Sequence, residues 1–435
     1  MHRVDGFPRP REALDFPENG QSSMKRTATF LAAVLSSIGF MAGAEDVMPV
    51  VDGGRADVIE GGSAAGFETW LAAFRPRAIA AGVTPETFEA AFSGIGFDTS
   101  VVEKDRNQNE FTKPIWLYLD TAVSSDRVAN GKAALAANSA LLDRIEAAYG
   151  VEKEVVVAIW GLETAYGTYR GKTPTIGSLA TLAYDTRRSA FFGAELIQAL
   201  KILQNGDTTP TAMIGSWAGA MGHTQFMPSS WATYAVDFNG DGRRDIWSDD
   251  PTDALASTAN YLKHWGWTTG QPWGYEIVLP PVFDYTQSGD RVVKPVSDWQ
   301  AMGIRRPDGS DLVPEGPASV LLPAGAEGAA FLIFPNFRVI ERYNPADAYV
   351  IAVGHLSDRI RGGDAILSDW PREDRALTLD ERVELQGRLA AAGFDPGGVD
   401  GKIGPNTIAA VRAYQIAQGL TPDGYASLAI LTKLR

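Results

Sequence analysis

The chain contains no cysteine among its 435 residues, and this absence constrains every fold it can adopt. Disulfides, thiolate metal sites and cysteine nucleophiles are all excluded. Stability must therefore come from buried apolar surface, and the content of 45% apolar and 10% aromatic residues is typical of a folded soluble protein. The length predicts two or three domains with a sizeable core.

Two segments precede the predicted mature chain. Residues 1–23 are polar and unpatterned, and we interpret them as a misassigned extension upstream of a true start at Met24. Residues 24–44 combine a charged start, a short apolar run and a small-residue cleavage pattern. This is the plan of a secretory signal peptide, and the alternative is a buried N-terminal helix. We therefore expect an exported protein that begins near Glu45.

Charge and composition narrow the location and the partners further. The apolar run of the predicted signal peptide is too short to span a bilayer, and a bacterial lipid anchor needs a cysteine that this chain lacks. We expect an unanchored protein in the periplasm of a Gram-negative bacterium. The net charge of −14 argues against a nucleic-acid partner, which would require a basic face. It does not oppose a carbohydrate partner.

The main body of the chain is predicted to be mainly α-helical (α+β class). Apolar residues recur at helical spacing from residue 67 to residue 264, and a further helix is predicted at 347–361. Between residues 275 and 337, short β-branched runs separated by glycine and proline predict a small strand-containing subdomain. Its expected strands lie at 276–279, 291–296 and 331–334. We assign 45–365 to one large domain and 366–376 to a linker.

Residues 377–435 form a compact unit of their own in this prediction. Thr378 and Glu381 have the spacing of a capping box, and three helices are expected. The dipeptide Asp-Gly recurs at Asp400-Gly401 and Asp423-Gly424, each time shortly before a helix. This short repeat of turn plus helix is too small for an active site, so we interpret the unit as a three-helix binding module.

Glu163 is the strongest candidate for catalysis. Residues 155–166 are predicted to form a helix, in which the residues three and four positions from Glu163 are apolar, aromatic or glycine and never a cation. They are Ile159, Trp160, Tyr166 and Gly167. A carboxyl group pressed against such surface has a raised pKa, as a general acid requires. The alternative is a solvated glutamate on a short helix.

Several motifs resemble a known enzyme family. Residues 161–167, 216–229 and 342–344 read GLETAYG, SWAGAMGHTQFMPS and RYN. They resemble the family-B lytic murein transglycosylases, and the resemblance extends from about residue 67 to residue 361. It implies a lysozyme-like α-domain with added subdomains. It also implies cleavage of the MurNAc–GlcNAc bond of peptidoglycan, with a 1,6-anhydro sugar as product.

The module at 377–435 resembles the peptidoglycan-binding domain type 1. The resemblance rests on the sequence VDGKIGPNT at 399–407, on Leu385-Gln386 and on Tyr414-Gln415. It implies that the partner is the glycan of peptidoglycan. Other cell-wall enzymes are candidates for further partners. We expect a monomer.

A single acid is consistent with this chemistry. Ordinary glycosidases need two carboxylates across the scissile bond, but no second acid lies in the segment of Glu163 or in residues 216–229. One carboxyl group suffices if the substrate supplies the nucleophile. Glu163 would protonate the leaving oxygen and then accept the proton of the MurNAc 6-hydroxyl as that oxygen attacks. A lysozyme-type hydrolase and a non-catalytic wall-binding protein are the alternatives.

The resemblance also assigns the residues that would bind substrate. Ser216, Gln225 and Asn344 would hold the N-acetyl and hydroxyl groups, although Ser216 could instead cap a helix. Gly219 and Gly222 would let the sugar approach the backbone closely. Four tyrosines would stack on sugars or donate hydrogen bonds, with core packing as the alternative for each: Tyr118, Tyr261, Tyr343 and Tyr349. His223 is expected to line the site without a catalytic role.

An acidic loop is a candidate calcium site, although we expect that the reaction itself requires no cofactor. Oxygen donors alternate at Asp237, Asn239 and Asp241, as in the first half of an EF-hand loop. Serine stands where the closing glutamate is expected. By resemblance, Asp253 would supply that carboxylate and the Arg243 carbonyl the middle ligand. Asp245, Asp249 and Asp250 compete with Asp253 for this closing position. The alternative to a calcium site is a loop without metal, in which Arg243 or Arg244 neutralises the acids.

Overall fold

The computed structural model describes residues 63–107 and 113–435. The predicted extension at 1–23 and the predicted signal peptide at 24–44 lie outside the described residues. Within the described ranges, no helix is long and apolar enough to cross a membrane. The fold is mainly helical, as predicted, and it contains three separate apolar cores.

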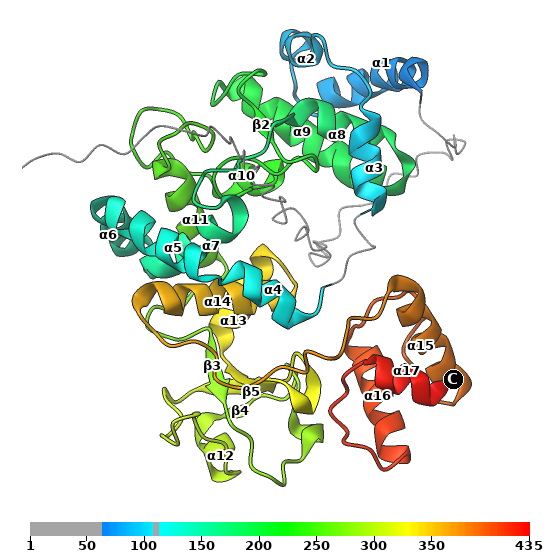
Figure 1. The fold of residues 1–435 in the computed structure, drawn as a ribbon. Coiled ribbons are helices and arrows are strands. Elements are labelled where there is room, and N and C mark those ends of the chain that lie inside the picture. The colour runs from blue at the N-terminus through cyan, green and yellow to red at the C-terminus, as the bar shows by residue number, and fades with distance from the viewer. Residues whose placement is uncertain (1–62, 108–112) are drawn as a thin grey trace, which may run out of the picture. The chain divides into compact units, whose positions relative to one another are not determined.

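The largest core belongs to a helical body (Figure 1). Its helices are α1 (Ala64–Ala80), α2 (Pro85–Phe92), α3 (Thr99–Asn107), α4 (Ile115–Ala122), α5 (Ser125–Ala137), α6 (Ser139–Tyr149), α7 (Lys153–Thr164), α8 (Thr175–Tyr184), α9 (Ser189–Asn205), α10 (Pro228–Tyr234), α11 (Thr252–His264), α13 (Pro335–Tyr343) and α14 (Asp347–Arg361). Two short strands, β1 (Thr173–Pro174) and β2 (Ile214–Gly215), pair antiparallel within it.

Helix α7 lies at the centre of this body. Residues 155–162 are buried without exception, so the helix presents no polar face between its first two residues and Glu163. A helix that is apolar on all sides must be surrounded by other elements, and α5, α6, α11 and α14 pack against it. The last turn of α7, which carries Glu163, therefore has its position set by four neighbouring helices.

A small antiparallel sheet has its own core. Its strands are β3 (Gly274–Ile277), β4 (Lys294–Pro295), β5 (Pro317–Leu321) and β6 (Ala330–Ile333), in the order β3-β6-β5-β4, with α12 (Val296–Ala301) after β4. The predicted subdomain is present. The strand β5 was missed, because its five residues begin with a proline and show no alternation: all but the first are buried.

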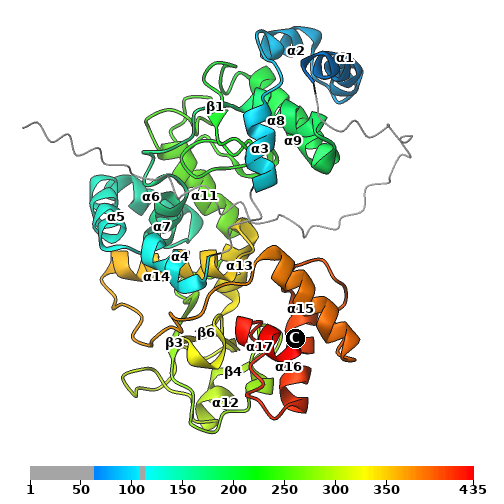
Figure 2. The ribbon, with the colours of Figure 1, turned by 45° about the vertical axis from the view of Figure 1, so that its right-hand side comes forward.

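The third core lies in the C-terminal module, whose helices α15 (Leu379–Ala391), α16 (Pro405–Ala417) and α17 (Leu428–Leu434) pack together (Figure 2). The Thr378–Glu381 capping box forms as predicted. The two Asp-Gly turns are held in matching ways: the Gln386 amide oxygen accepts from the Gly401 amide, and the Gln415 amide oxygen accepts from the Gly424 amide. The repeat seen in the sequence is therefore also a structural repeat.

The segment between α14 and α15 is irregular but anchored. The amides of Leu367 and Ser368 donate to the two oxygens of Glu276, at 2.8 and 2.6 Å. Arg372 forms a two-pronged ion pair with Asp120 on α4. The predicted linker at 366–376 thus makes specific contacts, while its boundaries stay a prediction.

Candidate active site

Glu163 is half-buried and follows directly after the buried run 155–162 of α7. It is the penultimate residue of α7, and the Tyr349 hydroxyl of α14 donates to its Oε1 at 2.6 Å. Burial disfavours the charged form and raises the pKa of Glu163 to about 7, while the hydrogen bond from Tyr349 acts in the opposite direction. At neutral pH the group can therefore both give and take a proton.

The predicted reason for this raised pKa was partly wrong. The helix ends at Thr164, because Ala165 and Tyr166 adopt left-handed backbone conformations with φ of 50° and 60°. Tyr166 and Gly167 thus do not continue the helical face of Glu163. Ile159 and Trp160 remain on the helix, and Tyr349 of α14 is a neighbour of the carboxyl group that the helical spacing does not show.

Two of the four predicted tyrosines lie close to the carboxyl group. Tyr349 is only 2% exposed and contacts Glu163 directly. Tyr343, at the end of α13, donates to the Thr224 carbonyl at 2.6 Å. Burial raises the pKa of both phenols, and the charge of Glu163 adds to this effect. Both therefore stay protonated and can act only as neutral hydrogen-bonding groups.

The other two tyrosines differ from each other. Tyr261 is buried, its hydroxyl donates to the Arg342 carbonyl at 2.5 Å, and its ring packs edge-on against that of Tyr343. Core packing, the alternative stated for each tyrosine, therefore describes Tyr261 better than contact with a sugar does. Tyr118 is half-buried on α4, and its electrostatic interaction with Tyr349 contributes to the raised pKa of Tyr349.

Residues 216–227, which make up most of the motif at 216–229, form a series of consecutive turns. The Ser216 hydroxyl accepts from the Ala220 amide at 3.0 Å, so it closes a turn and does not cap a helix. Gly219 and Gly222 both have positive φ. A Cβ on Gly219 would lie 2.4 Å from the Leu179 side chain, and one on Gly222 would lie 2.3 Å from the Ile246 carbonyl. Internal packing thus requires both glycines, whether or not a sugar approaches them.

The two predicted amide side chains are held by the backbone. Gln225 has a positive φ of 55°, and its Nε2 donates to the Gly222 carbonyl at 2.8 Å. Asn344 is buried at the end of α13, where its Oδ1 accepts from the Ala346 amide at 3.1 Å. Both are fixed in orientation, as groups that recognise a ligand need to be.

His223 is a buried structural residue. Its Nδ1 accepts from the Trp160 indole at 3.2 Å, and its Nε2 lies 2.7 Å from the Ser248 carbonyl. Burial lowers the pKa of His223, which matches a neutral ring with one acceptor and one donor nitrogen. The ring is thus committed to packing and has no free nitrogen for catalysis.

Three residues that position this site were missed from the sequence. The Thr164 hydroxyl donates to the His223 carbonyl at 2.6 Å, and Arg127 of α5 donates to the Gly161 carbonyl. Arg170 bridges to the Ser248 carbonyl and to Asp249, both at 2.6 Å. Only Thr164 could have been suspected, because it follows Glu163 directly. No local pattern connects the two arginines to their distant partners.

The four acids that compete for the closing position of the acidic loop have different partners in the structure. Asp253 is buried at the start of α11, and its oxygens accept from the amides of Phe238 and Asp245 at 2.8 and 2.9 Å. Asp245, Asp249 and Asp250 are engaged elsewhere, with the Trp247 amide, Arg170 and Thr252. Of these four acids, Asp253 is therefore the one whose carboxylate bonds to amides on both sides of residues 239–244.

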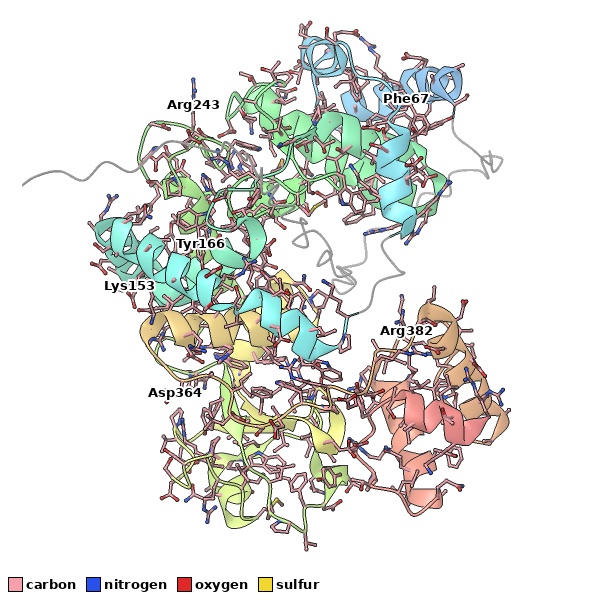
Figure 3. The ribbon with its side chains drawn as sticks, viewed as in Figure 1. Phe67, Lys153, Tyr166, Arg243, Asp364 and Arg382 are labelled. Atoms are coloured by element: carbon pink, nitrogen blue, oxygen red, sulfur yellow. The ribbon has the colours of Figure 1, made fainter. Side chains whose placement is uncertain are left out.

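The arginines do not neutralise this loop. Arg244 pairs with Asp207 at 3.2 Å, and Arg243 is exposed and extends outward (Figure 3). Burial raises the pKa of Asp253. The donor chemistry fits calcium, since hard cations prefer carboxylate and carbonyl oxygens. As placed, however, the loop acids bond to backbone amides, and no three His, Cys, Asp or Glu side chains of the described residues converge as a metal site.

Two family models match the chain. The transglycosylase SLT domain matches residues 66–358, and the putative peptidoglycan binding domain matches residues 378–434. The first match spans more than half of the 435 residues. The chain belongs to the family-B lytic transglycosylases.

Individual relatives agree with this placement. This transglycosylase is 36% identical to membrane-bound lytic murein transglycosylase B of Escherichia coli (strain K12) over 250 residues, which are 56% of this chain and 67% of that protein. The crystal structure of SltB3 from Pseudomonas aeruginosa in complex with NAG-anhNAM-pentapeptide is 51% identical, with a TM-score of 0.83, and the match covers 85% of this chain and 99% of that one.

A more distant solved structure contains calcium. The Escherichia coli lytic transglycosylase SLT35 in complex with calcium is 32% identical to this transglycosylase, with a TM-score of 0.58. The match covers 67% of this chain and 92% of that one.

Proposed function

We propose that this transglycosylase cleaves the MurNAc–GlcNAc bond of peptidoglycan without water and leaves 1,6-anhydro-MurNAc ends. The observation that carries the proposal is the half-buried Glu163, whose pKa of about 7 suits an acid that later acts as a base. Among the described residues, burial and Tyr349 are the influences on that pKa, and no second carboxylate contributes. The related SltB3 complex, which contains an anhydro sugar, supports the same product.

The proposed reaction has two steps. Glu163 first gives its proton to the glycosidic oxygen, so that the bond to the MurNAc anomeric carbon breaks and GlcNAc leaves with a new hydroxyl. The Glu163 carboxylate then takes the proton of the MurNAc 6-hydroxyl while that oxygen bonds to the anomeric carbon. Tyr349 donates to Oε1 throughout and leaves Oε2 for the sugar. Ser216, Gln225, Asn344 and Tyr343 are proposed to hold the sugar substituents.

Product analysis tests this proposal. Purified peptidoglycan is digested, and the released fragments are identified by mass spectrometry. We expect MurNAc ends that are lighter than reducing ends by one water, because no water enters the reaction. Reducing ends alone would instead identify a lysozyme-type hydrolase, and no release at all would favour a wall-binding protein without activity.

We propose that the C-terminal module binds the wall. It is matched by the putative peptidoglycan binding domain, and its core is separate from the other two cores. Removal of residues 377–435 is therefore expected to leave the catalytic fold intact, to weaken co-sedimentation with purified wall, and to spare cleavage of soluble glycan fragments. Equal sedimentation of the full chain and the shortened chain would refute this role. We also propose that the protein is exported to the periplasm, because its proposed substrate, peptidoglycan, lies there.

We propose that calcium binds the acidic loop as a structural ion and takes no part in the reaction. The ligands would be Asp237, Asn239, Asp241 and Asp253, with the Arg243 carbonyl. The buried Asp253 carboxylate and the calcium-containing relative support this proposal. In their present positions the acids satisfy loop amides, so binding requires them to turn toward the ion.

Thermal unfolding with and without calcium tests the ion. Calcium at a concentration of about 100 times its Kd is expected to raise the Tm by roughly 5 °C. Asp253→Asn should remove this increase, whereas Asp250→Asn, whose parent carboxylate bonds to Thr252, should retain it. The same Tm in calcium and in chelator would contradict the proposal.

A further inference from the structure

The backbone directly after Glu163 is strained. Within the described residues, the non-glycine positions with positive φ are Ala165, Tyr166 and Gln225, and two of them follow Glu163 by two and three residues. Side chains with a Cβ disfavour this conformation, which persists only where the surrounding structure holds it. The strain therefore calls for a contact that maintains it.

Tyr166 makes that contact by folding back against helices α5 and α7. Its hydroxyl donates to the Arg127 carbonyl of α5 at 2.7 Å. A Cβ on Gly161 of α7 would lie 2.6 Å from the phenol ring, and one on Gly131 of α5 would lie 2.6 Å from the hydroxyl. Two glycines thus form a slot that admits the ring, and Figure 3 marks Tyr166 where the end of α7 approaches α5.

The same turn is tied on its other side. Thr164 bonds to the His223 carbonyl in the segment 216–227, and its oxygen also accepts from the Gly167 amide at 2.9 Å. Arg127 donates in turn to the Gly161 carbonyl, near the C-terminal end of α7, where a cation is stabilising. Glu163 therefore lies between one attachment to α5 and another to the segment 216–227.

We propose that Tyr166 is a positioning residue for Glu163. Its phenol holds the left-handed turn closed, which keeps the end of α7 in place and the Glu163 carboxyl group against Tyr349, sheltered from water. Tyr166 does not itself need to touch the substrate. This inference rests on the proposed catalytic role of Glu163 and adds a residue that acts through it.

The groups around Glu163 define what a test can detect. The titratable groups that interact with Glu163 itself are Tyr349 of α14 and Tyr343 of α13. Behind them lie Tyr261 of α11, Tyr118 of α4, Arg127 of α5 and, beyond Thr164, His223. Replacing Tyr166 with phenylalanine changes none of these groups. It removes only the hydroxyl that bonds to the Arg127 carbonyl.

Steady-state kinetics of Tyr166→Phe on soluble glycan fragments provide the test. We expect kcat to fall by about tenfold or more with KM within roughly twofold, since small displacements of a catalytic group cost rate more than binding. A carboxyl group that gains access to water has a lower pKa. The high-pH loss of kcat is therefore expected to begin at a lower pH than in the parent.

Tyr169→Phe is the matched control, because Tyr169 lies in the same loop but is 62% exposed. If kcat and the pH profile of Tyr166→Phe equal those of this control, the proposal is overturned, even if the Tm falls. Glu163→Gln distinguishes a failure of the proposed function from a failure of the positioning role. Full activity of that variant would defeat the proposed function itself, whereas its inactivity beside an unchanged Tyr166→Phe would defeat only the positioning role.

Discussion

Replacing Glu163 with glutamine is expected to lower kcat for peptidoglycan cleavage by roughly 10³–10⁴-fold, near the upper end for a general acid–base residue. The amide can neither protonate the leaving oxygen nor accept the proton of the 6-hydroxyl, so both steps are affected. The fold should survive, because glutamine has nearly the same volume and its oxygen can still accept from Tyr349. Release of fragments from purified wall measures the effect.

Glu154→Gln is a suitable control for this variant. Glu154 lies in the first turn of the same helix, at the opposite end from Glu163, and pairs with Arg361 at 3.3 Å. It should keep near-parental activity. An active Glu163→Gln variant would sink the assignment of the acid, and equal losses in both variants would point to damage to α7 as a whole.

The second large effect is the dependence of activity on pH. Glu163 must be protonated in the free enzyme, so kcat/KM should fall about tenfold per pH unit above the pKa of about 7. Tyr349→Phe removes the donor that favours the carboxylate, which raises the pKa and should move this fall to higher pH. Tyr166→Phe is expected to move it in the opposite direction. A pH series of kcat/KM on soluble fragments measures all three.

Stability should change over the same range. The pKa of Glu163 is raised from 4.5 to about 7 in the folded state, so between these values the folded protein holds a proton that the unfolded chain has lost. The contribution of this group to stability therefore falls as pH rises from 4.5 to 7 and is constant above. Glu163→Gln should accordingly be more thermostable than the parent at pH 8. A Tm difference between the two that does not vary with pH would contradict the raised pKa.

Local signals explain why some elements were predicted correctly. The start of α2 needs only Thr84 as N-cap and Pro85 after it, and the start of α15 needs only Thr378 and Glu381. These interactions join residues three or fewer positions apart, so the sequence contains all their partners. Buried β5 lacked such a signal, because its pairing depends on β4 and β6, which are distant or separated by a turn.

The candidate site divides in the same way. By itself, the sequence determined that Glu163 lies on a largely apolar helix, that no second acid accompanies it, and that a family motif surrounds it. Tertiary structure alone decided that Tyr349 contacts the carboxyl group while Tyr261 packs in the core, that Asp253 bonds to amides of the acidic loop, and that Tyr166 leaves the helix to bond to α5. The physical reason is that a short-range pattern fixes periodicity and capping, whereas burial and the left-handed turn at Ala165 depend on contacts between segments that are far apart in the chain.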